Sequence, residues 1–165
     1  MADINKDKYC NTILYLISRM PDKKIHGRKK LAKLLYYVDF DRFEYQESMQ
    51  SVTGDTYTHK VKGPYPNKMN TVIEYMKHHG LLEENEVNEY GENYRPTVVY
   101  SSSEEPDLSS FDDDDKYILN RVAEKYRRYN GEDLAEKSHG EAPWLSVDDG
   151  EVIPYEMAFY RGTFD

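Results

Sequence analysis

Residues 28–45 constrain the fold most strongly, because they predict a helix that is apolar on more than one side. Apolar residues recur there at three- and four-residue steps, and aromatic residues widen the stripe. These positions are Leu31, Leu34, Leu35 and Val38, with Tyr36, Tyr37, Phe40 and Phe43 beside them. Such a helix has to be covered by other elements on several sides. The sequence therefore predicts a central helix.

Shorter periodic segments predict the helices around it. They are expected at residues 6–20, 67–79, 111–130 and 132–138, with a last helical turn within 153–160. Four consecutive aspartates, Asp112–Asp115, lie where the third of these helices begins. The helix dipole favours negative charge at that end, whereas a calcium loop needs spaced ligands and a glycine. We expect the aspartates to cap the helix.

The remaining segments predict turns and short strands. Residues 22–27 are expected to form a basic turn, and residues 56–61 alternate like a strand. Pro64 and Pro66 exclude a helix or a central strand around them. Residues 81–87 and 94–100 predict an antiparallel hairpin directly after a helix, the arrangement of a winged helix. The expected fold class is α+β, mostly helical: a compact helical domain with a small antiparallel β-hairpin that is winged-helix-like.

Length and charge bound the class of protein. At 165 residues and 19.5 kDa the chain predicts a single domain over residues 1–165. Its 22 Lys and Arg residues against 31 Asp and Glu residues give a net charge of −9, which excludes a uniformly basic DNA-coating protein. The chain has no apolar run of about 20 residues and no signal-peptide pattern at its start. We expect a soluble cytoplasmic protein with no membrane contact.

The sequence offers little for catalysis. Cys10, the single cysteine, lies on the apolar stripe of the first helix, so we expect it to be buried and inert. Nucleophile-elbow, phosphate-loop, dinucleotide and His-Glu-x-x-His motifs are all absent. We therefore predict no enzyme, no cofactor and no metal site. A site assembled in space from His59, His139 and an acid is the remaining catalytic alternative.

Charge is segregated along the chain. Residues 19–33 carry seven basic residues and one acid, for a net charge of +6, while residues 83–115 carry a net −11. The alternative function is therefore a winged-helix-type DNA-binding regulator that contacts nucleic acid through the basic segment 19–33. Its contact residues would be Arg28, Lys29, Lys30 and Lys33. The simpler interpretation is that Lys29, Lys30 and Lys33 form a solvated helix face. The acidic hairpin favours a basic protein partner over DNA.

Five segments occur in an order that resembles a known family. They are residues 27–40 (Gly-Arg-Lys-Lys-Leu-Ala-Lys-Leu-Leu-Tyr-Tyr-Val-Asp-Phe), 53–57 (Thr-Gly-Asp-Thr-Tyr), 62–66 (Lys-Gly-Pro-Tyr-Pro), 134–144 (Leu-Ala-Glu-Lys-Ser-His-Gly-Glu-Ala-Pro-Trp) and 151–156 (Glu-Val-Ile-Pro-Tyr-Glu). The set is similar to the Panacea domain, the SocA-like antitoxin family. Tyr65 and Lys137 depart from the pattern, since the family often has an aliphatic residue at the first position and prefers leucine at the second.

The resemblance implies a function by binding and brings no catalytic residues. A protein of this family would neutralise a cognate toxin directly or act as an adaptor that delivers the toxin to a host protease, and it could also bind operator DNA. The sequence leaves open whether a small molecule binds.

The partner-binding candidates are Asp55, Tyr57, Tyr65, His139 and Trp144. The chain's 16 tyrosines fit this reading, because aromatic residues are enriched at interfaces. The structural alternative is that Trp144 packs over the helices and that His139 hydrogen-bonds a backbone carbonyl.

Overall fold

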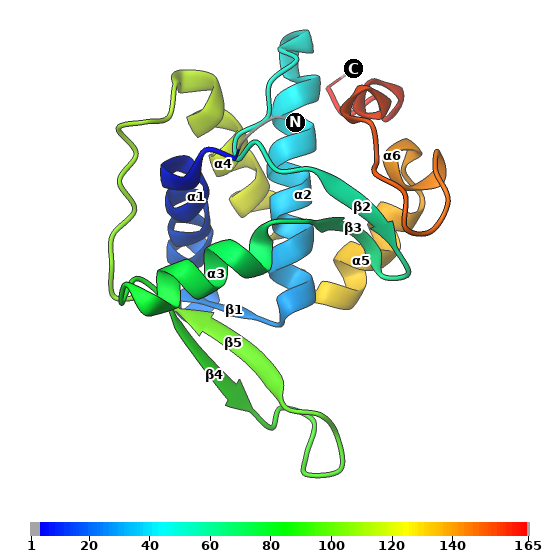
Figure 1. The fold of residues 1–165 in the computed structure, drawn as a ribbon. Helices are drawn as coiled ribbons and strands as arrows, with labels where there is room; N and C mark the ends of the chain where they lie inside the picture. The colour runs from blue at the N-terminus through cyan, green and yellow to red at the C-terminus, as the bar shows by residue number, and fades with distance from the viewer. Residues whose placement is uncertain (1–3, 165) are drawn as a thin grey trace.

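Helix α2 runs through the middle of the molecule, as the sequence predicts (Figure 1). The computed structural model describes residues 4–164. All residues of α2 from Lys30 to Glu44 are buried, because α1, α4, α5, β3 and η3 pack around it. The helices are α1 (Lys6–Arg19), α2 (Arg28–Glu44), α3 (Met69–His78), α4 (Asp113–Tyr126), α5 (Gly131–His139) and α6 (Ala142–Leu145), with the 3-10 turns η1 (Pro21–Lys23), η2 (Tyr45–Glu47) and η3 (Tyr155–Tyr160). The α+β, mostly helical class is confirmed.

Side-chain caps fix where three of these helices begin. Asn5 accepts a hydrogen bond from the backbone N–H of Lys8 at the start of α1. Asp112 and Asp115 form a capping box at α4, so the prediction for the aspartate run is confirmed. Asn130 and Asp133 form a second capping box at α5. Cys10 is buried on α1, as expected, and burial raises the pKa of its thiol.

Two small antiparallel sheets complete the fold. The predicted hairpin is β4 (Glu83–Val87) with β5 (Thr97–Ser101), and it projects away from the helices in Figure 1. Residues 24–26, expected in a turn, instead form β1 (Lys24–His26), which pairs with β5 and gives the strand order β1-β5-β4. A three-residue strand shows no alternation in the sequence, and Ile25 becomes buried only where β5 lies beside it. Whether the hairpin acts as a wing stays a prediction.

The second sheet joins β2 (Tyr57–Lys60) to β3 (Gly63–Pro66), which holds both prolines in an edge strand. The C-terminal segment runs along the other side of β2. Thr58 pairs there with Val152, and the N–H of Ile153 donates to the carbonyl of Tyr57 at 2.8 Å. This arrangement places β2, β3, α5, α6 and η3 together on one side of α2. Within residues 4–164, no helix has the length and apolarity to cross a membrane.

Candidate partner-binding surface

Three of the sequence motifs meet around the side chain of Lys33. Its Nζ reaches from α2 and donates to the carbonyl of Pro64 at 3.0 Å. Gly63 has φ +111°, and a Cβ added there would lie 2.5 Å from Lys33 Cε and 2.6 Å from Ser138 Oγ. Only glycine combines this backbone conformation with this close approach. The motif residues at positions 33, 63, 64 and 138 therefore hold α2, β3 and α5 together.

Lys33 is buried, with 1% of its surface exposed, so the expectation of a solvated helix face is wrong for this residue. Burial, with a smaller contribution from nearby Lys29, lowers the pKa of Lys33 to about 7. The Pro64 carbonyl supplies an acceptor for the ammonium but no countercharge.

The other predicted nucleic-acid contacts are also engaged within the protein. Lys30 is buried, and its Nζ donates to the carbonyl of Arg127 at 2.9 Å. Lys29 pairs with Glu132. Arg28 donates to Asn70 at 2.6 Å and lies 3.6 Å from Glu84. Lys33 cannot contact a phosphate backbone, because β3 and α5 cover it, and the Lys30 ammonium already donates to a backbone carbonyl.

Two histidines and the single tryptophan form a stack where the second sheet meets α5 and α6. The ring of Trp144 lies 4.1 Å from that of His59 and 4.3 Å from that of His139, between ring centroids. Trp144 Nε1 donates to the carbonyl of Lys60 at 2.8 Å, and His59 Nδ1 donates to the carbonyl of Trp144 at 2.7 Å. The expected carbonyl bond thus belongs to His59. Nε2 of His139 is buried without a hydrogen-bond partner among the described residues.

Exposed aliphatic side chains occur in the segments that carry this stack. We call Val61, Leu145 and Val152 the apolar rim; their exposed fractions are 77%, 61% and 58%. Leu145 follows Trp144, and Val61 follows Lys60, the residue that binds the tryptophan. Val152 lies opposite Thr58, one position before His59. The rim residues and the half-buried Trp144 therefore belong to neighbouring segments, namely the β2–β3 turn, α6 and the segment that pairs with β2.

The remaining candidates lie deeper. Tyr57 is fully buried, and its hydroxyl donates to Asp39 at 2.6 Å. Asp55 is buried and accepts hydrogen bonds from the hydroxyl of Tyr9 at 2.7 Å and from the N–H of Lys68 at 2.9 Å. Tyr65 is half-buried and is the only one of the three with an exposed portion. Tyr57 and Asp55 can position a surface but cannot contact a partner.

The family model described as Antitoxin SocA-like, Panacea domain matches residues 31–145. That range covers most of the chain and includes Lys33, Gly63, Ser138 and Trp144. The chain belongs to the SocA-like Panacea antitoxin family. Comparison with curated proteins and with solved structures gave no match. Membership supports a role in a toxin–antitoxin system and indicates a regulator that is not catalytic.

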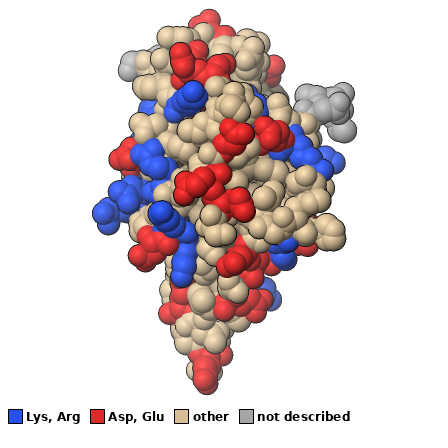
Figure 2. Space-filling model, turned by 90° about the vertical axis from the view of Figure 1, so that its left-hand side faces the viewer, with Lys and Arg blue, Asp and Glu red and all other residues tan. Residues whose placement is uncertain are grey.

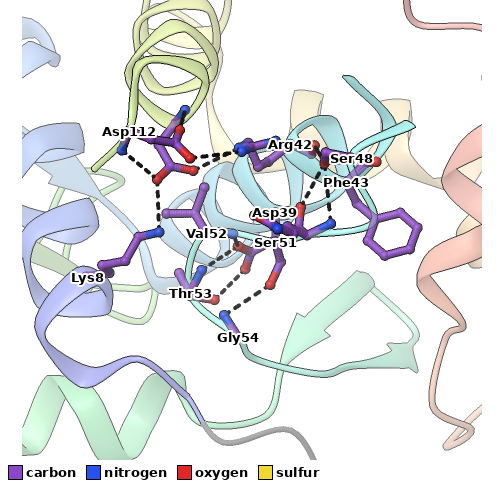
Figure 3. Close-up of polar contacts among 12 residues, drawn as sticks. Lys8, Asp39, Arg42, Phe43, Ser48, Ser51, Val52, Thr53, Gly54 and Asp112 are labelled. Atoms are coloured by element: carbon purple, nitrogen blue, oxygen red, sulfur yellow. Dashed lines mark hydrogen bonds and ion pairs between the residues drawn. The ribbon is translucent and has the colours of Figure 1, made fainter. Parts of the chain in front are cut away.

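Asp39 holds a loop of the Panacea domain against α2 (Figure 3). Its carboxylate accepts hydrogen bonds from the N–H groups of Val52 and Thr53 and from the hydroxyls of Thr53 and Tyr57. Burial raises the pKa of Asp39 to about 6, although these four donors oppose the rise. Sequence reasoning missed this role, and an aspartate within the most apolar part of α2 was the available signal.

The C-terminal part of the Panacea domain is attached to α2 by a buried ion cluster. Arg161 contacts Asp41 at 2.7 Å, Glu44 at 2.8 Å and Glu141 at 3.3 Å. Burial raises the pKa of Asp41, while Arg161 and Arg121 oppose it. A polar cavity of about 320 Å³ opens beside the cluster. Each acid of the cluster is paired with a cation. We interpret the cluster as a structural contact that holds the C-terminal segment against α2.

The sequence also left open a catalytic site formed by His59, His139 and an acid. The structure places both histidines against Trp144 instead. Each ring contacts Trp144, and among the described residues neither ring hydrogen-bonds an acidic side chain. Within the described part of the Panacea domain, no three His, Cys, Asp or Glu side chains gather as metal ligands would.

Proposed function

We propose that this Panacea domain neutralises a cognate toxin by binding it directly through the Trp144 stack and the apolar rim. The observation that carries the proposal is a pre-ordered tryptophan in ring contact with two histidines, on segments that also carry exposed aliphatic side chains. The occupant follows from family membership, since an antitoxin requires a toxin as its partner.

This surface has the composition of an interface core. Such cores are enriched in aromatic side chains and depleted in charge, and buried aromatic anchors contribute much of the binding energy. Trp144 already has its ring stacked and its indole N–H bonded to Lys60. Binding would therefore cost little additional side-chain entropy at the anchor. Asp55 and Tyr57 support the surface from beneath, through Tyr9 and Asp39.

The growth of cells expressing the adjacent gene, alone and together with this protein, tests the proposal. Arrest by the neighbour and recovery on co-expression would establish neutralisation. Leu145→Asp places a charge in the rim and should abolish recovery, because a buried unpaired charge is strongly unfavourable at an interface. Tyr94→Asp is the matched control, since Tyr94 is 65% exposed but lies in the β4–β5 connection.

Equal recovery by the two variants would exclude the rim as the toxin contact. The amount of toxin separates the two modes of neutralisation. Direct blocking leaves the toxin level unchanged, and delivery to a protease lowers it until that protease is deleted. A toxic neighbour that is never rescued by soluble co-expressed protein would refute that pairing.

DNA binding through residues 19–33 is not part of the proposal. Lys30 and Lys33 are buried, and Arg28 and Lys29 face Glu84 and Glu132. The face in Figure 2 also carries acidic side chains across its centre and on the tapering hairpin. The internal contacts of these four residues oppose binding of a phosphate backbone through α2 itself.

A further inference from the structure

A basic hollow lies between β1, the start of α2 and the C-terminal end of α4. It is a cavity of about 340 Å³, and we define the basic hollow by the five residues Lys24, His26, Lys30, Arg127 and Arg128 that line it. Asp22 and Glu89 also line the cavity, and Glu89 pairs with His26. Four lysine and arginine side chains against two acids give a local excess of positive charge on a chain of net charge −9.

The lysine and arginine side chains of the hollow form no ion pair within the described chain. Lys24, Arg127 and Arg128 form no ion pair there, in contrast to Arg19, Arg28 and Lys29 of the neighbouring segment. Nε of Arg127 is buried without any hydrogen-bond acceptor among residues 4–164. Lys30 is buried too, and burial alone lowers the pKa of its ammonium. Like charges are thus held together around a cavity whose four lysine and arginine side chains outnumber its two acids, Asp22 and Glu89.

Stabilisation of the end of α4 explains only part of this arrangement. Cations at a helix C-terminus interact favourably with the last carbonyls, and Lys30 does this by binding the carbonyl of Arg127. Lys24 comes from a separate strand, and the orphaned Nε of Arg127 caps nothing. The convergence therefore indicates a site for an anion from outside the chain.

We propose that the basic hollow binds the phosphate of a nucleotide, either free or within a nucleic acid. Guanidinium groups bind phosphate through paired, charge-assisted hydrogen bonds, and Arg127 and Arg128 supply two of them. Tyr129 lines the hollow and is 39% exposed. A second cavity of about 200 Å³ shares His26, Lys30, Glu89 and Asn130 with the first and is also lined by the exposed Tyr90. Tyrosine faces next to bound phosphate are the surfaces on which a base stacks.

Titration with inorganic pyrophosphate, followed by backbone-amide chemical shifts in NMR, tests the site. Saturable shifts are expected at residues 24–30 and 126–130 at low salt. Lys24→Gln combined with Arg128→Gln should weaken binding by about tenfold or more, because two charged contacts are removed. Lys23→Gln is the matched control, since it removes a neighbouring exposed lysine that does not line the hollow. It should bind pyrophosphate as the wild type does.

Absence of saturable shifts, or equal binding by the double variant, would overturn the proposal, as would an equal loss in Lys23→Gln. A nucleoside diphosphate and a short DNA duplex then separate the two sources of phosphate. Tighter binding of the nucleoside diphosphate than of pyrophosphate identifies a free nucleotide. Duplex binding with a salt slope reduced by about two in the double variant identifies a nucleic-acid backbone. Toxin rescue is independent of these measurements, so either proposal can fail alone.

Discussion

Replacing Lys33 with methionine should remove a specific pH dependence from the free energy of unfolding. Lys33 is almost completely buried beneath Gly63, and among the described residues the carbonyl of Pro64 is the only hydrogen-bond partner of its ammonium. Methionine has a similar length and no charge, so it can occupy the same space. It also leaves the Pro64 carbonyl without its donor, which costs about 1–3 kcal/mol at every pH.

The sign and size follow from the two pKa values. Burial lowers the pKa of Lys33 from 10.5 to about 7 in the folded protein. Between these values the unfolded chain binds more protons, so this lysine makes the folded state more stable as pH rises through the window. For a folded pKa of about 7, raising the pH from about 7 to about 9 should stabilise the wild type by about 2 kcal/mol through Lys33. The methionine variant should lack this increment.

Urea unfolding monitored by circular dichroism at both pH values measures the difference directly. Contributions from all other titrating groups cancel when the variant is subtracted from the wild type, provided that the fold is unchanged. Lys23→Met is the control, because Lys23 is exposed, and it should keep the wild-type pH dependence. A wild-type-minus-variant difference that is flat across the window would refute the reasoning, since Lys33 would then titrate alike in both states.

Two further stability predictions depend on single close contacts. Gly63→Ala should destabilise the protein by about 1–3 kcal/mol, because the added Cβ overlaps the side chain of Lys33 and the residue has a positive φ. Thermal unfolding should show a lower midpoint, and an unchanged midpoint would contradict the close approach. Arg161→Met should cost about 3–5 kcal/mol near neutral pH, because Asp41 and Glu44 then lose their buried cation. Urea unfolding checks this, and a smaller loss at acidic pH should accompany protonation of Asp41, whose pKa burial already raises.

The helices were predictable because their signals are local. Apolar periodicity located α1, α2, α3 and α4, and the aspartate run at the start of α4 indicated its cap. The order of the family motifs also came directly from the sequence. Helix ends were less certain, since α4 ends at Tyr126 whereas the pattern extended to residue 130. Apolar residues beyond a helix end can continue the periodicity without being helical.

The contacts that define the candidate surface were not predictable, because their partners are distant in sequence. Lys33 and the Pro64 carbonyl are 31 positions apart, and Arg161 and Asp41 are 120 positions apart. A lysine within a helical segment is normally predicted to be exposed to solvent. Its aliphatic stem can nevertheless be buried when a turn of the chain covers it. The basic segment was therefore assigned to the surface although two of its lysines lie inside.

The burial of the motif residues indicates how one scaffold could serve different partners. Lys33, Gly63 and Ser138 contact one another and hold α2, β3 and α5, so changes there disturb the fold. Val61 and Leu145 lie beside the motif segments with their side chains exposed, so changes there leave the packing intact. Exposed substitutions away from such contacts usually alter stability by less than about 0.5 kcal/mol. Partner choice can therefore vary at the rim while the motifs preserve the scaffold, and Leu145→Asp should lose toxin rescue while unfolding like the wild type.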